Sequence, residues 1–559
     1  MRVKRWLIFA SSFVSFLLGV VPTLAQDSSK PFIMPLSQPA GPSTWMFGQP
    51  YGNTVGAFNF GTAWYSAGQG LHFGIDISMP CNTPVIAVAD GDVIYVDNLN
   101  FGAGPHNLIL RHSQANVTTL YGHLLDRPPV QQYQPVRQGD VVGYSGDPDV
   151  TCDSRPHLHF EVRSLDYRTA FNPVDYIDAN WDVLAAMGPF NSNLFEQDLT
   201  NPRQWMRLAD QPPVSFGGAR VNAYTSAWPP PNDERAPNSA APLRPFTALG
   251  DAAWTLRPLG IDGCCATRWW HPTNPDRLFV IDGTPGQNAA SFEWDIPGNS
   301  MTGYLEPAPP PQFSPDGTHF VRRSGSQIII HRQADGAEWT VNTSGFTPAI
   351  NADSTRLLWQ VQYGQSVPGA TPPQVEIWVS DIDGANARQI MSDTRISASW
   401  IDGSRLLVSS SEKTVTTLSV YNVVDGSSFA LGSWDRVRGV SIAPGGQRLV
   451  YYQSFQSDPT VNAIYALELQ AGAQPKRLDW FGAYRWRDAE SLYYIPFEPS
   501  TPVQTLMYYH VPSGERRILI DPATQPFTIR NGDWSVSPDG RRIVFQNTDG
   551  NMMMVEAAG

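Results

Sequence analysis

Two segments in the first third of the chain alternate apolar and polar residues with the period of a β-strand. Residues 71–77 read LHFGIDI, and residues 157–163 read HLHFEVR. Because successive side chains on a strand point to opposite faces, each segment can bury an apolar face and present a polar one. The polar faces carry imidazole and carboxylate groups: His72 and Asp76 in the first segment, and His157, His159 and Glu161 in the second.

Further short apolar runs surround these segments. Residues 83–97 (TPVIAVADGDVIYVD) predict two strands around Asp90-Gly91, a pair that favours a hairpin turn. Three more strands are predicted at residues 107–112, 117–124 and 140–144. The first third of the chain is therefore expected to be a β-sheet domain.

From about residue 250 the pattern becomes a repeat. A turn of the Pro-Asp-Gly kind precedes a short apolar strand seven times, at steps of 37 to 51 residues. This period is typical of a four-stranded propeller blade. The repeated strands are RLFVI, HFVRR, RLLWQV, RLLVSS, RLVYYQ, LYYIP and RIVFQ.

These repeats resemble the WD40-like SPDG repeats of TolB-type β-propellers. The motif is complete at residues 314–317 and 537–540 and degenerate in the other copies. We therefore expect an all-β chain, with an antiparallel sheet domain followed by a β-propeller of about seven blades.

The histidines point to metal chemistry in the first domain, since six of the ten lie between His72 and His159. Two imidazoles and one carboxylate suit Zn²⁺ and leave a fourth position open, as in catalytic zinc sites. Zinc lowers the pKa of water in that position toward neutrality, and further histidines nearby can move protons. The sequence has no CxxC pair and so offers no cysteine zinc site of that kind.

Three motifs in order resemble peptidase family M23, the LytM/lysostaphin type of zinc endopeptidase. They are HxxxD at His72–Asp76, a YxHL-like element at Tyr121–Leu124, and HxH at His157–His159. The runs PVIAVADGDV and QGDVVG support the likeness, which covers about residues 60–175. The resemblance implies two sets of residues: His72, Asp76 and His159 as zinc ligands, and His123 and His157 as the catalytic pair. One of the pair would accept a proton from water and the other would stabilise the oxyanion, and the sequence leaves open which does which.

The resemblance implies a zinc metalloendopeptidase that hydrolyses stem or cross-bridge peptide bonds of peptidoglycan by a zinc-activated water. The propeller would then bind or position the enzyme, or recruit a protein partner. The alternative is a non-catalytic protein of the same fold that binds the cell wall or activates another hydrolase. One departure from the family lies at residues 146–156 (GDPDVTCDSRP), where relatives usually have a Gly/Ser/Thr-rich loop. It can reshape the substrate groove without touching the ligands.

Other polar groups in this domain have structural interpretations. We expect His112 to be a structural strand histidine and His106 to face solvent from a loop. Glu161 either supports the zinc ligands from behind or pairs with Arg163 on the surface.

The net charge argues against some classes of partner, and the N-terminus predicts the location of the protein. A formal net charge of −13 without a Lys/Arg cluster argues against nucleic acid or an anionic membrane as partner. A basic start, an apolar run over residues 6–21 and Thr23-Leu24-Ala25 predict an export signal cleaved after Ala25, with an uncleaved anchor as the alternative. We find no further apolar segment long enough to span a membrane. The expected location is extracellular, or periplasmic in the cell envelope.

The four cysteines fit an exported chain, in which disulfides persist. Cys81 and Cys152 both fall in the expected peptidase domain, which favours a bridge between them. Cys264 and Cys265 are adjacent, and either a vicinal bridge or buried thiols remain open. The predicted organisation is a signal peptide at 1–25, an M23 domain at 26–185, a Pro-rich linker at 186–249 and the propeller at 250–559.

Overall fold

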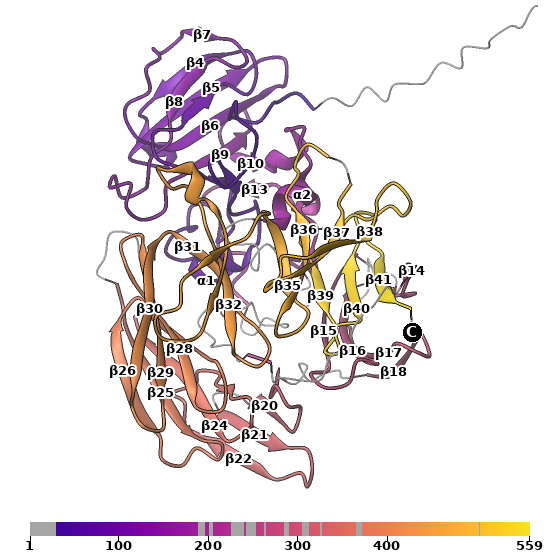
Figure 1. The fold of residues 1–559 in the computed structure, drawn as a ribbon. Helices are drawn as coiled ribbons and strands as arrows, with labels where there is room; N and C mark the ends of the chain where they lie inside the picture. The colour runs from indigo at the N-terminus through magenta and orange to yellow at the C-terminus, as the bar shows by residue number, and fades with distance from the viewer. Residues whose placement is uncertain are drawn as a thin grey trace, which may run out of the picture.

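The computed structural model describes most of the chain and consists almost entirely of antiparallel β-sheet (Figure 1). The described residues are 30–187, 196–200, 205–224, 240–241, 253–261, 264–283, 290–304, 312–324, 327–364, 372–501, 503–530 and 532–558. The predicted signal peptide lies outside them. None of the helices within these ranges has the length and apolar character needed to cross a membrane.

The N-terminal domain is built on one sheet with the strand order β1-β2-β9-β6-β5-β4-β7. In that order the strands are Met46–Phe47, Ile75–Ser78, His157–Arg163, Val117–Leu124, His106–His112, Gly91–Val96 and Pro135–Val136. A small second sheet pairs β3 (Pro84–Ile86) with β8 (Val141–Tyr144). The predicted antiparallel sheet domain is thus confirmed.

A later segment of the chain adds two more strands to this sheet. β10 (Thr169–Phe171) pairs with β9 and also with β13 (Val214–Ser215). The hydroxyl of Tyr51 accepts a hydrogen bond from Val214 N at 2.8 Å. Part of the segment expected to be a linker therefore belongs to the first domain, because its proline-rich composition still allows a two-residue strand at the sheet edge.

The second half forms seven four-stranded sheets, which confirms the propeller. Each repeated apolar strand of the sequence becomes an inner strand of its sheet and pairs with the strand just before it in the chain. The strands are β16 (Arg277–Gly283), β20 (His319–Ser324), β24 (Arg356–Tyr363), β28 (Arg405–Glu412), β32 (Arg448–Gln453), β36 (Ser491–Pro496) and β40 (Arg542–Gln546).

One sheet closes the ring by joining the two ends of the propeller sequence. β14 (Trp254–Pro258) pairs with β41 (Met552–Ala557), next to β40 and β39 (Trp534–Val536). Pairing the first strand with the last leaves no open blade between the ends of the ring, and closure of this kind protects strand edges.

The serine and glycine of the SPDG turns stabilise the turn that precedes the apolar strand. Ser314 Oγ donates to Asp316 Oδ1 at 2.6 Å and accepts from His319 N at 3.0 Å, which ties the turn to the start of β20. Gly317 has a φ of 72°, a conformation that glycine adopts without strain. The motif therefore sets the entry of a blade's second strand.

Buried and polar contacts attach the N-terminal domain to the propeller. Met46 in β1 and Met187 after α2 (Trp181–Ala186) share a hydrophobic cluster with Tyr452 and Phe455 of the propeller. Phe455 N donates to Pro42 O at 2.7 Å. In Figure 1, α2 lies beside β36 and β37 (Leu506–His510) of the yellow end of the chain.

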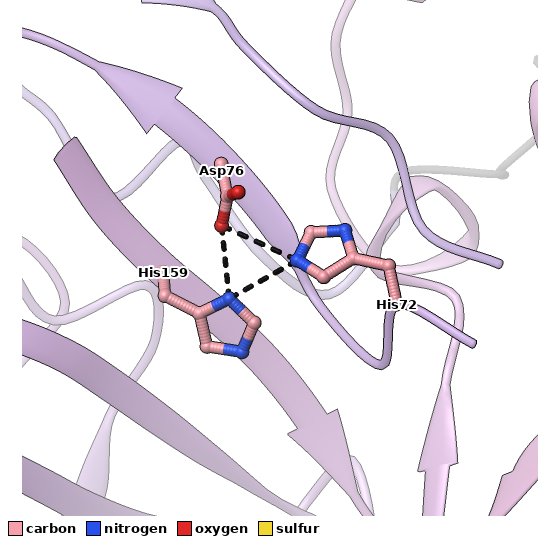
Figure 2. Close-up of side chains that lie close together, drawn as sticks. All are labelled: His72, Asp76 and His159. Atoms are coloured by element: carbon pink, nitrogen blue, oxygen red, sulfur yellow. Dashed lines mark hydrogen bonds and ion pairs between the residues drawn. The ribbon is translucent and has the colours of Figure 1, made fainter. Parts of the chain in front are cut away.

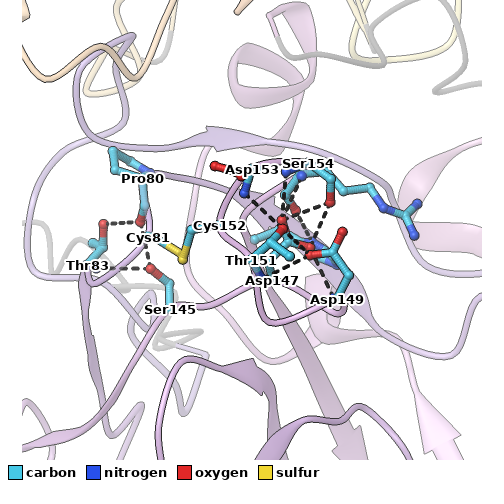
Figure 3. Close-up of a disulfide and its surroundings, with 12 residues drawn as sticks. Pro80, Cys81, Thr83, Ser145, Asp147, Asp149, Thr151, Cys152, Asp153 and Ser154 are labelled. Carbon is cyan, nitrogen blue, oxygen red and sulfur yellow. Dashed lines mark hydrogen bonds between the residues drawn. A yellow bond between two sulfur atoms is a disulfide. The ribbon is translucent and has the colours of Figure 1, made fainter. Parts of the chain in front are cut away.

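A disulfide joins Cys81, just after β2, to Cys152 in the loop before β9, as the sequence favoured (Figure 3). β15 (Cys264–Trp270) contains the adjacent cysteines, whose side chains lie outside those that the structure describes.

Replacing both Cys81 and Cys152 by serine should lower the free energy of unfolding of the N-terminal domain by about 2–4 kcal/mol. The bridge spans 71 residues, and a cross-link of that length removes much of the entropy of the unfolded chain. Calorimetry should show a lower melting temperature for this domain than in the oxidised wild type. Reductant should lower the wild-type value and leave the double variant unchanged. Equal melting temperatures for variant and oxidised wild type would contradict the expectation.

Candidate metal centre

The register of three neighbouring strands sets the position of the central side chains. In the antiparallel pair of β2 and β9, Asp76 lies directly opposite His159. On the other side of β9, Gly122 of β6 lies opposite His159, so that His123 follows next to it. Leu158, Phe160 and Val162 alternate with the polar residues of β9 and are fully buried in the core. Burial of this apolar face fixes the register, because a slip by one residue would turn it outward.

His72 reaches the same place by a different route from the one predicted. β2 begins only at Ile75, so strand alternation does not carry back to His72. An isolated bridge holds it instead: Gly52 N donates to His72 O at 2.7 Å, and His72 N donates to Gly52 O at 2.9 Å. Gly74 permits the tight bend, since a Cβ there would lie 2.6 Å from the carbonyl oxygen of Phe160.

Figure 2 shows the three side chains converging on one point. The Oδ1 atom of Asp76 lies 2.9 Å from His159 Nδ1 and 3.3 Å from His72 Nε2. The two imidazole nitrogens are 3.2 Å apart. The structure thus brings together the three residues that the sequence analysis named as ligands.

Hydrogen bonds on the far side of each ring decide which nitrogen faces the centre. His72 Nδ1 donates to Pro50 O at 2.6 Å, and His159 Nε2 donates to Glu161 Oε1 at 3.1 Å. Carbonyl and carboxylate oxygens only accept, so these ring nitrogens carry the hydrogens. When the rings are neutral, His72 Nε2 and His159 Nδ1 therefore present lone pairs to the same point as the carboxylate of Asp76.

This donor set fits a zinc ion. Three electron-rich atoms at 2.9–3.3 Å repel one another unless a cation or a proton lies among them. Ligands at 2.0–2.1 Å around a tetrahedral zinc ion lie about 3.3 Å apart, close to the observed spacing. Two imidazoles and a carboxylate also leave one tetrahedral position for water or substrate.

The charges of the cluster support the same interpretation. Burial opposes ionisation of Asp76, but His72, His157 and His159 outweigh it and hold the pKa of this carboxyl well below its usual range. Burial also opposes protonation of His159, but its contacts with Asp76 and Glu161 prevail and raise its pKa to about 9. The centre therefore attracts positive charge, and a bound metal ion would take the place of that proton.

Glu161 contacts both His159 and Arg163, the two partners that the sequence left as alternatives, but its pair with Arg163 is buried and does not lie on the surface. One carboxylate oxygen accepts from His159 Nε2, and the other accepts from Arg163 Nε. Glu161 is fully buried, and the Arg163 cation helps to keep its pKa low despite that burial. Outer carboxylates of this kind orient metal-binding imidazoles and make them better ligands.

His123 and His157 lie beside the cluster with their ring centroids 4.7 Å apart. His157 Nδ1 donates to Arg155 O at 2.7 Å, and His123 Nδ1 donates to Gly104 O. Each neutral ring therefore has an unprotonated Nε2, and that of His157 lies 3.8 Å from Asp76 Oδ1. Burial lowers the pKa of both rings, and for His123 the neighbouring His157 lowers it further.

The two remaining histidines of the domain lie outside this cluster. His112 is buried in β5, where its Nδ1 donates to Asp90 O at 2.9 Å and its Nε2 accepts from the Thr119 hydroxyl, which suits a structural role. His106 is half-buried and pairs with Asp97 at 3.0 Å, so it is less open to solvent than the sequence suggested.

Two aromatic residues that precede His72 lie beside the cluster and were not predicted from the sequence. Tyr65 is buried with its ring 5.4 Å from that of His72, and its hydroxyl donates to Gln49 Oε1 at 2.9 Å. Trp64 carries the guanidinium group of Arg155 over its ring. The aromatic run FNFGTAWY just before the first motif was the available signal.

Comparison with known proteins agrees with this geometry. Residues 70–173 match the family description "Peptidase family M23". An uncharacterised lipoprotein, YgeR, of Escherichia coli is 37% identical over 114 residues, which cover 20% of this chain and 42% of that protein.

Two relatives have named activities. Glycyl-glycine endopeptidase ALE-1 of Staphylococcus capitis is 26% identical over 148 residues, 26% of this chain and 38% of its own. DD-carboxypeptidase/endopeptidase Mpg of Neisseria meningitidis is 41% identical over 93 residues, 17% of this chain and 20% of its own. This chain thus spans less than half of the length of each of these three relatives. The matched family, the ordered motifs and the fold agree: this chain carries a peptidase family M23 domain, joined to a seven-bladed β-propeller.

Proposed function

We propose that this protein is an exported zinc metalloendopeptidase that hydrolyses peptide bonds of peptidoglycan. The observation that carries the proposal is the convergence of two imidazole lone pairs and one carboxylate within 3.3 Å of one another. Three such atoms at this spacing need a positive charge among them, and a zinc ion would supply it.

In this proposal the chain's own residues divide into two roles. His72, Asp76 and His159 hold the ion, which when bound supplies Lewis acidity that polarises a peptide carbonyl and makes water more acidic. His123 and His157 move protons. Each is neutral near pH 7 with an unprotonated Nε2, so either can accept a proton and then donate it to the oxyanion or the leaving amine.

The named relatives support the class of substrate. One is called a glycyl-glycine endopeptidase and another a DD-carboxypeptidase/endopeptidase, so both names describe peptide-bond hydrolysis at different bonds. The lipoprotein relative and the predicted export signal support a location in the envelope or outside the cell. We assign the propeller a binding or positioning role, since it is firmly attached to the peptidase domain.

Replacing His72 or Asp76 by alanine should abolish zinc retention. Each change removes one of three ligand atoms, and an ion left with two protein ligands dissociates readily. Zinc measured by plasma mass spectrometry after dialysis should fall from about one ion per chain to near zero. His331→Ala, a propeller histidine paired with Glu338, should retain wild-type zinc. Retention of zinc by Asp76→Ala would show that the ligand set is wrong.

Replacing His123 by alanine should leave zinc bound and reduce kcat about 10²–10⁴-fold, the usual contribution of a general acid or base. Release of new amino groups from purified peptidoglycan, with mass identification of the fragments, measures the effect. His106→Ala is the matched control, since it lies outside the cluster. Loss of zinc in His123→Ala would contradict the division of roles. A zinc-loaded wild type that releases no fragments would favour the non-catalytic alternative.

The acid limb of kcat/KM should lie below pH 6.5. Burial lowers the pKa of His123 and His157 from the usual 6.5, so their rings stay neutral, and able to accept a proton, to lower pH than a free histidine. Activity should therefore hold as pH falls to 6.5 and then drop as the rings become protonated. A pH–rate profile with zinc content checked at each point measures this. A midpoint above pH 6.5 would be inconsistent with the buried geometry.

A further inference from the structure

Arg155 is a half-buried cation at the edge of the candidate metal centre. Its backbone N donates to Asp147 Oδ2 at 2.9 Å, and its carbonyl oxygen accepts from His157 Nδ1 at 2.7 Å. These two hydrogen bonds hold the backbone of Arg155, and the second one joins it to the ring of His157, a proposed catalytic residue. The side chain of Arg155 therefore begins next to the proposed catalytic site.

The guanidinium group extends from there over the indole ring of Trp64, with Cζ 4.5 Å from the ring centroid. Trp64 directly precedes Tyr65, whose ring packs edge-on against His72. The side chain of Arg155 therefore links the loop at residues 146–156 to the segment that precedes His72. A guanidinium group that lies over an aromatic ring can still use its N–H donors to bind an anion.

No carboxylate among the described residues lies within 4.0 Å of this guanidinium, and none of their acceptors takes a hydrogen bond from it. Two other arginines of the domain do have such partners: Arg163 pairs with Glu161, and Arg127 pairs with Asp97 at 3.3 Å. A partly desolvated guanidinium without an anion is costly, and a planar carboxylate matches its fork of donors. The side chain is thus prepared for an anionic group that comes from outside.

We propose that Arg155 is a specificity-determining residue that binds a free carboxylate of the peptide substrate close to the bond that is cleaved. The inference rests on the proposed function and narrows it. Stem peptides of peptidoglycan carry free carboxylates beside their peptide bonds, whereas the interior of a glycine cross-bridge carries none. The structure thereby favours the stem peptide as substrate.

The loop that carries Arg155 is held from several sides, which limits the entropy lost when a ligand binds. The disulfide ties Cys152 to Cys81, and Asp147 accepts hydrogen bonds from Ser154 N and Oγ (Figure 3). Asp147 also accepts a hydrogen bond from Arg155 N.

Two contacts from the propeller reach the same loop. Lys413, between β28 and β29 (Val415–Asn422), pairs with Asp153 at 2.7 Å, and Arg436 Nη2 donates to Cys152 O at 3.4 Å. The backbone of the loop therefore has contacts with both domains, and the ring of Trp64 lies under the guanidinium group.

The test uses the full chain with zinc and two forms of one substrate: purified peptidoglycan, and the same material after its free carboxylates are converted to primary amides with carbodiimide and ammonia. The initial rate of fragment release is measured for the wild type, Arg155→Gln, Arg155→Lys and the exposed control Arg111→Gln. Amidation should slow the wild type about 10- to 100-fold, the worth of a charge-assisted hydrogen bond. The Arg111→Gln variant should show the same ratio.

Arg155→Gln should cleave the untreated substrate as slowly as the wild type cleaves the amide, and amidation should slow it no further. Arg155→Lys keeps the positive charge but loses the paired N–H donors of the guanidinium group. Its rate on the untreated substrate should lie between the rates of the wild type and Arg155→Gln. If amidation slows Arg155→Gln as much as the wild type, Arg155 serves only as packing for Trp64 and the inference is wrong. Equal wild-type rates on both substrates overturn it even if the variants do not fold. A zinc-loaded wild type that cleaves neither form contradicts the proposed function itself.

Discussion

The antiparallel pairing of β2 with β9 is the constraint on which the rest of the site depends. It sets Asp76 opposite His159, and the pairing of β9 with β6 brings His123 to the same spot. Each strand has a side-chain period of two, so the buried apolar residues of β9 allow only one register. The hydrophobic core beneath β9 therefore fixes where the proposed ligands Asp76 and His159 meet.

Hydrogen bonds on the outer side of each histidine ring decide which ring nitrogen can bind a metal ion or a proton. Each ring in the centre has one nitrogen committed to an oxygen behind it: the carbonyls of Pro50, Gly104 and Arg155, and the carboxylate of Glu161. The other nitrogen of each neutral ring therefore carries a lone pair that points into the centre. The two proposed ligand histidines, His72 and His159, and the two proposed catalytic histidines, His123 and His157, differ in where that lone pair points. The oxygen atoms behind the rings determine this direction.

The sequence allowed much of this to be predicted, for physical reasons that can be named. Seven turns with an apolar strand after each predicted the blades, because a turn and the strand that follows it are local. The alternation in HLHFEVR correctly placed His157, His159 and Glu161 on one face of a strand. His72 does lie in the predicted cluster, but the strand predicted over residues 71–77 begins only at Ile75. The bridge that positions His72 joins it to Gly52, and no local pattern reveals such a contact between distant residues. For the same reason Tyr65, and the return of β13 to the first sheet, were not foreseen.

The propeller can influence the site through two routes of different strength. The Lys413–Asp153 pair is exposed on both sides, so water and salt screen it and it contributes little. The other route is buried. Met46 lies in the same hydrophobic cluster as Tyr452 of the propeller, and Met46 pairs directly with Ser78 in β2, two residues from Asp76. Burial of apolar surface is not screened by salt, so the attachment of the propeller supports β2 more strongly than it supports the loop. The propeller should therefore stabilise the ligand strand, while the disulfide and Asp147 mainly hold the loop that carries Arg155.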